Sequence, residues 1–317
     1  MPDPSSSDRR AAMQTFDAPA TRTLLPAAAL VSAVAAAMRA RRAGKITAPE
    51  RLTLSLPGGG RYLVMPAADD ELAITKLVAV HPANPARGLP TIHAQLVVAD
   101  ARDGRALMLL DGPTVTARRT AAVTALGLRV LGASPVRSVA LLGTGAQALE
   151  HARLLAELGE VSALHLVGRT RAQAEACAEA LGAELGGVTL TAHATLAGAL
   201  DAAQAVVTLT TSLRPVLPEH LPAALLVVGV GAFTPQMAEL PPALLRSRRV
   251  IVDALEGARS EAGDLIQAAI DWSQVSELVD HLDEPAPAGA APVFKTVGQA
   301  AWDLAAAHVA HRMLATS

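Results

Sequence analysis

One stretch near the middle of the chain constrains the fold more than any other. Residues 139–142 (Val-Ala-Leu-Leu) lead into residues 143–148 (Gly-Thr-Gly-Ala-Gln-Ala), and a helix-like sequence follows. An apolar strand, a glycine turn and a helix are the context in which such a turn binds the pyrophosphate of a dinucleotide. Gly143 makes the tight turn, Gly145 lets the backbone approach the phosphates, and the small Ala148 lets helix pack on strand. The chain is therefore predicted to contain a dinucleotide-binding domain that begins after residue 100.

Short apolar strands alternate with helices from this region onward. The candidate strands are residues 138–142, 163–167, 205–210, 225–229 and 250–253. Strands separated by helices are typical of an open parallel sheet. We therefore expect an α/β fold with a Rossmann-type, doubly wound parallel sheet.

The first part of the chain has a different pattern. After a predicted helix at 24–38, strand-like runs and turn signals such as Asp103-Gly104 predict a meander of antiparallel strands, and thus a smaller α+β domain. Residues 51–56 alternate strictly, so their leucines are expected to face the core. The run at 24–38 has no charge but is too short to cross a bilayer, so no membrane association is expected.

Composition and charge exclude several classes of protein. Of 317 residues, 51% are hydrophobic and 18% are charged, as in a globular protein with a sizeable core. A net charge of −2 leaves no broad basic surface for nucleic acid. The single cysteine, Cys177, cannot form a disulfide within the chain and fits a reducing, cytoplasmic setting. The expected partners are a small molecule and another copy of the chain.

The end of the second expected parallel strand indicates which dinucleotide is bound. A carboxylate there would bind the ribose hydroxyls of NAD, whereas arginine accommodates the additional phosphate of NADP. The chain has Gly168-Arg169-Thr170-Arg171 at this point and no carboxylate. These side chains would form a phosphate clamp, although a solvated helix start is the alternative. NADP is favoured as the cofactor, with NAD as the alternative.

Arg118 and Arg119 suggest a bound anion. With Thr114 or Thr116 as N-cap, both arginines fall in the first turn of a helix at 117–131. The helix dipole disfavours a cation there by about 0.3–1 kcal/mol. A substrate carboxylate or a pyrophosphate would explain the pair, and ordinary surface arginines are the alternative.

Lys76 is the other cation in an unusual setting. Strand alternation places it on the same face as Ile74 and Val78, where a lysine needs a partner or a function. The alternative is a charge that protects an edge strand. Arg51 shares the polar face of its strand with Thr53, so its sequence context alone favours solvent.

The remaining sequence signals do not indicate another catalytic function. His93 lies alone in a strand, where a histidine is usually structural. The sequence contains no metalloprotease HExxH, no P-loop and no Gly-x-Ser-x-Gly, which argues against metalloproteases, nucleotidases and hydrolases.

Eight segments, in order and spacing, resemble the ornithine cyclodeaminase/mu-crystallin family over nearly the whole chain. They are residues 64–67, 75–78, 88–91, 110–112, 115–122, 143–148, 261–264 and 293–298. The resemblance implies a homodimer, with a substrate-binding and dimerisation domain at 14–115 and 293–317 and a Rossmann domain at 116–292. It also implies that Arg51, Lys76 and Arg119 hold a substrate carboxylate beside the nicotinamide. The residues it implies around the cofactor are Thr91, Arg119, Gly143, Thr144, Gly145, Ala146, Gln147, Arg169, Thr170, Thr210, Thr211, Val230, Gly231 and Thr296.

One departure from the family pattern bears on the reaction. Cyclodeaminases of the family have an aspartate in a Gly-Asp-x-Pro-like setting, and the matching run here, residues 230–235, has Phe233 in its place. Phenylalanine cannot transfer a proton. Cyclodeamination requires several proton transfers, whereas reduction of an imine requires fewer.

The leading hypothesis is an NADPH-dependent reductase of a small cyclic imino acid of the pyrroline- or piperideine-2-carboxylate type. Lys76 and His93 are the candidates if the reaction needs a dedicated acid. One alternative is ornithine cyclodeaminase, which forms proline and ammonia from ornithine, or an alanine dehydrogenase-like activity. Another is a non-catalytic, NADP-dependent binding protein for a small ligand, with Phe233 supplying apolar surface.

Overall fold

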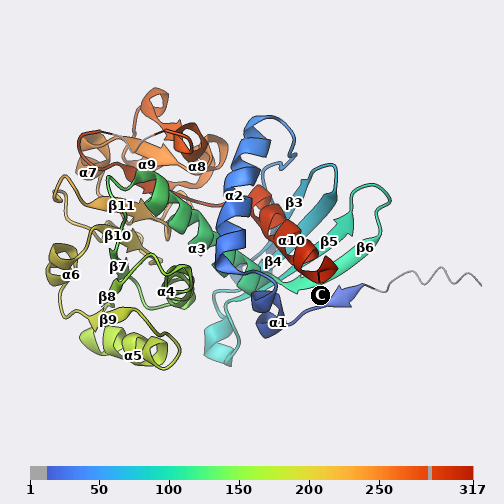
Figure 1. The fold of residues 1–317 in the computed structure, drawn as a ribbon, viewed down its shortest axis with the longest axis horizontal. Helices are drawn as coiled ribbons and strands as arrows, with labels where there is room; N and C mark the ends of the chain where they lie inside the picture. The colour runs from blue at the N-terminus through green and yellow to red at the C-terminus, as the bar shows by residue number, and fades with distance from the viewer. Residues whose placement is uncertain (1–12, 285–287, 317) are drawn as a thin grey trace, which may run out of the picture.

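The computed structural model describes residues 13–284 and 288–316 and contains two sheets (Figure 1). The larger sheet has eight parallel strands in the order β13-β12-β14-β11-β10-β7-β8-β9. Its strands are β7 (Ser138–Leu142), β8 (Ala163–Val167), β9 (Thr189–Ala192), β10 (Ala205–Thr208), β11 (Leu226–Gly229), β12 (Val250–Val252), β13 (Ser276–Glu277) and β14 (Val293–Lys295). This is the expected Rossmann-type architecture, and the five candidate strands correspond to β7, β8, β10, β11 and β12.

Three strands of this sheet were not predicted. β9 and β13 are short edge strands, and β14 pairs with both β11 and β12. Residues 293–295, which the expected division places in the smaller domain, thus lie inside the parallel sheet. The helices that accompany the sheet are α4 (Ala146–Leu158), α5 (Arg171–Gly182), α6 (Leu196–Ala202), α7 (Pro242–Ser247), α8 (Leu255–Glu261) and α9 (Gly263–Gln267).

The second sheet has six strands in the order β1-β6-β5-β4-β3-β2. They are β1 (Gln14–Thr15), β2 (Leu52–Leu56), β3 (Gly60–Ala68), β4 (Leu72–Val80), β5 (Ile92–Asp100) and β6 (Ala106–Asp111). Strands β2 to β6 form the expected antiparallel meander, and β1 joins β6 in parallel.

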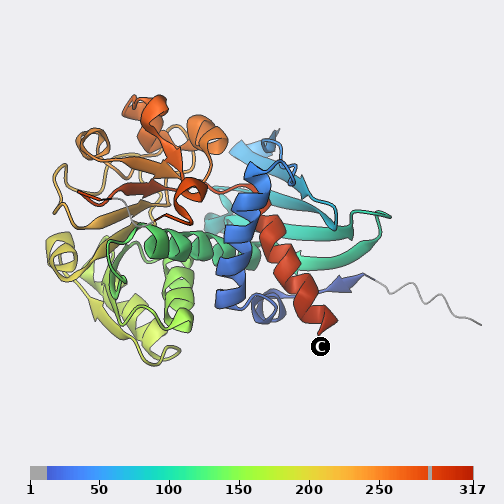
Figure 2. The ribbon, with the colours of Figure 1, turned by 45° about the horizontal axis from the view of Figure 1, so that its top comes forward.

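Helices α1 (Ala18–Thr23), α2 (Ala27–Arg42), α3 (Gly112–Leu131) and α10 (Ala300–Ala315) complete the fold. In both views α2 runs between the two sheets, and α10 lies beside α2 against the smaller sheet, where it contacts β3 and β4 (Figures 1 and 2). Helix α3 connects the sheets: a Cβ on Gly112 would touch Ala94 of β5, and a Cβ on Gly127 would touch the ring of Phe294 in β14. One hydrophobic core therefore extends from α2 and α10 to both sheets.

The start of α3 differs from the prediction. The helix begins at Gly112 with Asp111 as N-cap, whose carboxylate accepts hydrogen bonds from the Thr114 amide and hydroxyl at 2.9 and 2.6 Å. Arg118 and Arg119 therefore lie beyond the first turn, and the helix-dipole argument for an anion at that point was wrong.

The leucines of β2 also face the opposite way from the prediction. Leu52 pairs with Val64, which pairs with Leu77, and this face is not the one covered by α10. Leu52 and Leu54 are 57% and 48% exposed. Strict alternation revealed the two faces of the strand correctly but did not reveal which face the helices cover.

Within the described ranges, no helix combines the length and apolar character that crossing a membrane requires.

Candidate active site

A buried carboxylate on α10 joins two of the three predicted cations. Asp303 Oδ2 lies 2.7 Å from Nζ of Lys76, and Asp303 Oδ1 accepts a hydrogen bond from Nε of Arg119 at 3.1 Å. Lys76 and Arg119 are 2% and 5% exposed, and Asp303 is fully buried. β4 lies in the interior of its sheet, so Lys76 does not protect an edge strand, and Asp303 is the partner that its apolar setting demands.

The third predicted cation, Arg51, contacts Gly298, which lies just before α10. Arg51 donates to the carbonyl of Gly298 at 3.3 Å and to Oε2 of Glu261 at 2.7 Å. A Cβ on Gly298 would lie 2.1 Å from a terminal nitrogen of Arg119, so this guanidinium rests on the glycine. Arg51 and Arg119 thus meet at one residue although they lie far apart in the sequence.

The cations influence the ionisation of their neighbours. Burial lowers the pKa of Lys76 to about 8, while Asp303 raises it and Arg119 and Arg51 lower it further. Burial also raises the pKa of Glu261 to about 7, against the lowering effect of Arg51. The site therefore contains two groups that titrate near neutral pH.

Arg119 retains donors for an anion. Its Nε binds Asp303, and in the described part of the chain no further hydrogen bond engages its two terminal nitrogens. A guanidinium with a free pair of nitrogens is the group that binds a carboxylate in a bidentate manner.

A second carboxylate fixes the loop that carries Gly298. Asp253, at the end of β12, accepts hydrogen bonds from the Thr296 hydroxyl at 2.8 Å, the Gly298 amide at 3.0 Å and the Trp302 indole at 3.1 Å. Thr296 is buried, and its hydroxyl is committed to Asp253.

The glycine turn has the shape that a dinucleotide requires. Gly143 has φ +134°, and a Cβ there would lie 2.6 Å from the carbonyl of Leu209. A Cβ on Gly145 would meet nothing within 4 Å, so the turn leaves space in front of α4. No side chain caps this helix, and its first amides are left for a phosphate group. Residues 143–147 therefore fit the pyrophosphate.

At the end of β8, Arg169 and Thr170 are exposed. Thr170 caps α5 by accepting from the Gln173 amide at 3.3 Å, and Arg171 pairs with Glu175 at 2.6 Å. In the part of the chain that the structure describes, Arg169 forms no ion pair, so its guanidinium is available for a phosphate.

Glu239 ties together the ends of β10 and β11. Its buried carboxylate accepts from the hydroxyls of Thr208 and Thr210, both at 2.8 Å, and from the amides of Thr210 and Gly231 at 2.6 and 2.7 Å. The carboxyl ends of parallel strands are where such folds bind ligands. Two residues implied as cofactor contacts, Thr210 and Gly231, are thus held in place by one side chain.

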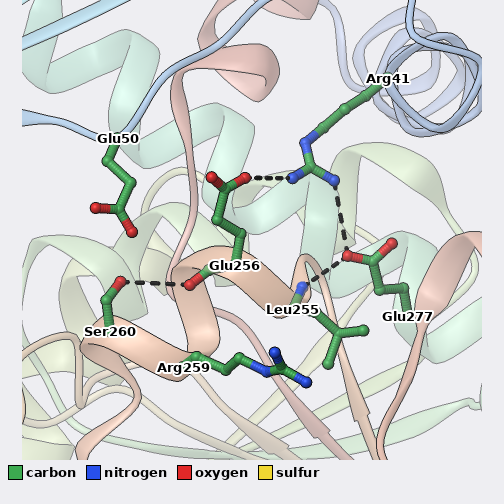
Figure 3. Close-up of a pocket in the computed structure, with 7 residues that line it drawn as sticks. All are labelled: Arg41, Glu50, Leu255, Glu256, Arg259, Ser260 and Glu277. Atoms are coloured by element: carbon green, nitrogen blue, oxygen red, sulfur yellow. Dashed lines mark hydrogen bonds and ion pairs between the residues drawn. The ribbon is translucent and has the colours of Figure 1, made fainter.

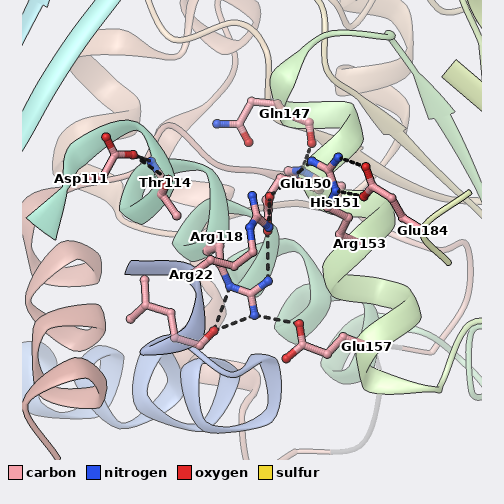
Figure 4. Close-up of polar contacts among 11 residues, drawn as sticks. Arg22, Asp111, Thr114, Arg118, Gln147, Glu150, His151, Arg153, Glu157 and Glu184 are labelled. Atoms are coloured by element: carbon pink, nitrogen blue, oxygen red, sulfur yellow. Dashed lines mark hydrogen bonds and ion pairs between the residues drawn. The ribbon is translucent and has the colours of Figure 1, made fainter. Parts of the chain in front are cut away.

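Arg118 does not join the cationic site, contrary to the prediction that both arginines bind an anion. It donates to the Leu25 carbonyl at 2.8 and 2.6 Å and to Glu150 and Glu157 on α4 at 3.0 and 2.8 Å (Figure 4). Arg22 also pairs with Glu150, at 2.6 Å. Arg118 therefore joins the N-terminal segment to α4. Successive residues on a helix point about 100° apart, which sends the two arginines to different partners.

The other predicted residues are distributed around the site. Thr91 is half-buried at the start of β5, and its carbonyl accepts from the His81 amide. Val230 is buried next to Gly231, and Thr211 is exposed. His93 is exposed and pairs with Ala79, on the opposite sheet face from Lys76. Phe233, beyond β11, is 43% exposed.

Sequence reasoning missed four carboxylates that organise the site: Asp303, Glu261, Asp253 and Glu239. For Asp303 a signal existed, because it is the sole charged residue in the run Ala300–Ala307 of an apolar helix. Glu261 lay within a segment quoted for the family resemblance but received no role. No comparable signal marks Glu239.

Gly143 follows β7 and Gly298 follows β14, so the glycine turn and the loop that the cationic cluster contacts both lie at the carboxyl edge of the parallel sheet. This arrangement is that of an NAD(P)-dependent oxidoreductase. The model of the ornithine cyclodeaminase/mu-crystallin family matches residues 12–316, and the chain belongs to this family.

The names of similar proteins agree with this class. The chain is 46% identical over 307 residues to Delta(1)-pyrroline-2-carboxylate reductase 1 of Burkholderia multivorans, which covers 95% of this chain and 96% of the relative. It is 45% identical over 300 residues to the Delta(1)-pyrroline-2-carboxylate/Delta(1)-piperideine-2-carboxylate reductase of Azospirillum brasilense, with coverage of 95% and 96%. The Thermococcus litoralis Delta(1)-pyrroline-2-carboxylate reductase, solved with NADH and L-proline, has the same fold, with a TM-score of 0.86 at 23% identity over 95% of this chain and 97% of that one.

Proposed function

We propose that the protein reduces a small cyclic imino acid of the pyrroline- or piperideine-2-carboxylate type, with NADPH as the preferred reductant. The observation that carries this function is the meeting of Arg51 and Arg119 at Gly298, with Lys76 joined to them through Asp303. The two most similar relatives described above carry this activity in their names.

The cationic cluster holds the substrate carboxylate. The free nitrogens of Arg119 donate hydrogen bonds to its two oxygens, and the charges of Lys76 and Arg51 add attraction in a setting that excludes much of the water. Residues 143–147 would hold the pyrophosphate of the nicotinamide cofactor, which when bound would supply the hydride for the imine carbon. Fixing the carboxylate orients that carbon, and such positioning contributes several kcal/mol to lowering a barrier, about 7–11 kcal/mol in the best cases.

Reduction is favoured over cyclodeamination because of Phe233. The aspartate that the family resemblance implies for cyclodeaminases is replaced by a side chain that holds no proton. Cyclodeamination of ornithine would require that missing proton transfer, so the structure lacks a group for it at this position.

The test is a panel of reactions with the purified protein. NADPH oxidation is measured with pyrroline-2-carboxylate and piperideine-2-carboxylate, and ornithine plus NAD serves as the contrasting arm. We expect the wild type to reduce the imines and the variants Arg119→Ala and Lys76→Ala to have lost this activity. The control variant Arg61→Ala, at an exposed position of β3, should keep it. Normal turnover in both clamp variants would refute the carboxylate clamp. Ammonia and proline from ornithine would favour cyclodeaminase, and tight binding without turnover would favour a binding protein.

The preference for NADPH depends on Arg169. We expect Arg169→Ala to raise KM for NADPH at least tenfold and to leave KM for NADH nearly unchanged, because only NADP carries the extra phosphate. Arg171→Ala is the matched control, since Arg171 is already paired with Glu175. Equal KM values of the wild type for NADH and NADPH would contradict the preference.

We further propose that two copies pair through the sheet face that carries Leu52 and Leu54. These exposed leucines lie beside Tyr62, Val64 and Leu77 on the same face. An apolar surface of this kind is typical of an interface. Leu54→Lys should convert a particle of twice the chain's mass into a single chain in light scattering, whereas Leu213→Lys, at another exposed leucine, should not.

A further inference from the structure

Glu261 contacts the cationic cluster and also lines a cavity. It pairs with Arg51 at 2.7 Å, and its side chain is 18% exposed. The cavity is narrow, with a volume of about 40 Å³, and Arg51, Gly298 and Gln299 also line it. This cavity adjoins a groove of about 570 Å³, because both are lined by Arg41, Glu50, Glu256 and Ser260 (Figure 3).

The cavity is suited to water. A water molecule needs roughly 10–15 Å³ of such volume and two to four polar partners. Arg51 and Glu261 supply polar atoms, and within the described residues the buried amide nitrogen of Gln299 has no hydrogen-bond partner. Glu261 can therefore exchange protons with the groove through water in this cavity.

We propose that Glu261 is the proton-carrying residue of the site: it takes up a proton from the groove when a carboxylate anion engages Arg51, and it supplies this proton to the imine nitrogen. This inference rests on the proposed reductase function. The reduction breaks the C=N π bond, forms one C–H bond with a hydride from the reduced nicotinamide, and forms one N–H bond with this proton.

The charges around Glu261 explain the coupling. Arg51 and Arg119 stabilise its ionised form, whereas Asp253, Glu50 and burial oppose it, and together they place its pKa at about 7. An anion bound to Arg51 cancels much of the attraction that keeps Glu261 ionised. The pKa of Glu261 then rises, and at pH 7–8 the carboxylate takes up a proton.

Proton uptake can be measured directly. Pyrrole-2-carboxylate, a planar carboxylate that cannot be reduced as an imine, is titrated into the cofactor-loaded enzyme at pH 7.5 in phosphate and in Tris. These buffers differ in ionisation enthalpy, so the difference in heat gives the protons taken up. We expect uptake of a substantial fraction of a proton in the wild type and in Glu256→Gln. Uptake in Glu261→Gln should be clearly smaller, because Lys76 is then the remaining group of the site that titrates near this pH. Glu256 is a matched control because it lies on the same helix and pairs with an arginine, Arg41.

Two further readouts separate proton transfer from a structural role. Between pH 7 and 8 the Kd of the wild type should rise by up to about tenfold, whereas that of Glu261→Gln should rise appreciably only above pH 8, where Lys76 loses its charge. The kcat for the imine should fall at least tenfold in Glu261→Gln although the ligand still binds. Binding with equal proton uptake in wild type and Glu261→Gln would overturn the inference and leave the carboxylate clamp standing. Absence of binding in every variant would overturn the clamp itself and this inference with it.

Discussion

Asp303 Oδ2 and Lys76 Nζ lie 2.7 Å apart in the interior of the protein, where neither side chain reaches much solvent. The same carboxylate holds Nε of Arg119 at 3.1 Å. Asp303 therefore fixes the spacing of two cations and keeps one of them charged.

Replacement of Asp303 by Asn should weaken substrate binding more than catalysis by the bound complex. Without the carboxylate the pKa of Lys76 falls further below its ordinary value, so a larger fraction of the lysine is uncharged at neutral pH. We expect KM for the imino acid to rise at least tenfold and the free energy of unfolding to fall by about 3–5 kcal/mol. Steady-state kinetics and urea titration measure the two effects. Asp283→Asn, in an exposed pair with Arg39, is the control, and an unchanged KM in Asp303→Asn would contradict this role.

Gly298 should tolerate no side chain. A Cβ there would approach a terminal nitrogen of Arg119 to 2.1 Å, and φ is +75°. We expect Gly298→Ala to displace the guanidinium and lower kcat/KM at least 100-fold. Gly44→Ala separates the clash from the backbone strain, because Gly44 has φ +70° and no atom within 4 Å of its Cβ position. Each substitution should lower the free energy of unfolding by about 1 kcal/mol because of the positive φ alone. Equal activities of the two variants would therefore show that the contact with Arg119 is unimportant.

Arg118 should matter for stability rather than for substrate binding. Arg118→Met leaves Glu157 and the Leu25 carbonyl without their buried partner, and we expect a loss of about 3–5 kcal/mol in urea titration. KM for the imino acid, measured where the variant is folded, should change less than twofold. Arg129→Met removes a partly exposed pair with Glu160 and should cost about 0–1 kcal/mol. A large rise in KM for Arg118→Met would show that this arginine also contributes to substrate binding.

His151 should make the protein sensitive to acid. Its Nδ1 donates to the Gln147 carbonyl at 2.7 Å, its Nε2 accepts from the Thr124 hydroxyl at 2.9 Å, and burial lowers its pKa to about 4. Because the folded-state pKa lies below the unfolded one, this contribution is complete above pH 6.5 and is lost as the pH falls toward 4.

The shift of His151 corresponds to about 3 kcal/mol, which should disappear from the free energy of unfolding between pH 6.5 and 4. Urea titrations across this range should show a shallower dependence for His151→Gln than for the wild type. His220→Gln, at an exposed position, should keep the steep dependence. Identical slopes for wild type and His151→Gln would assign the acid sensitivity to other groups.

Local signals determined much of the parallel sheet. The glycine turn and the five apolar runs marked β7, β8, β10, β11 and β12 because burial on both faces requires uninterrupted apolar residues. The short strands β9 and β13 carry no such signal. β14 was missed because its place between β11 and β12 depends on a pairing across more than 40 residues.

For the site, the sequence by itself determined which residue types were available and which were unusual, above all Lys76 on an apolar face and the resemblance that singled out Arg51 and Arg119. Only the tertiary structure decided how they were used. It separated Arg118 from Arg119, exposed the leucines of β2, and brought Asp303 and Glu261 to the cations. The physical reason is that periodicity specifies the two faces of an element, whereas the covering of a face and the pairing of a buried charge are set by segments far away in the chain.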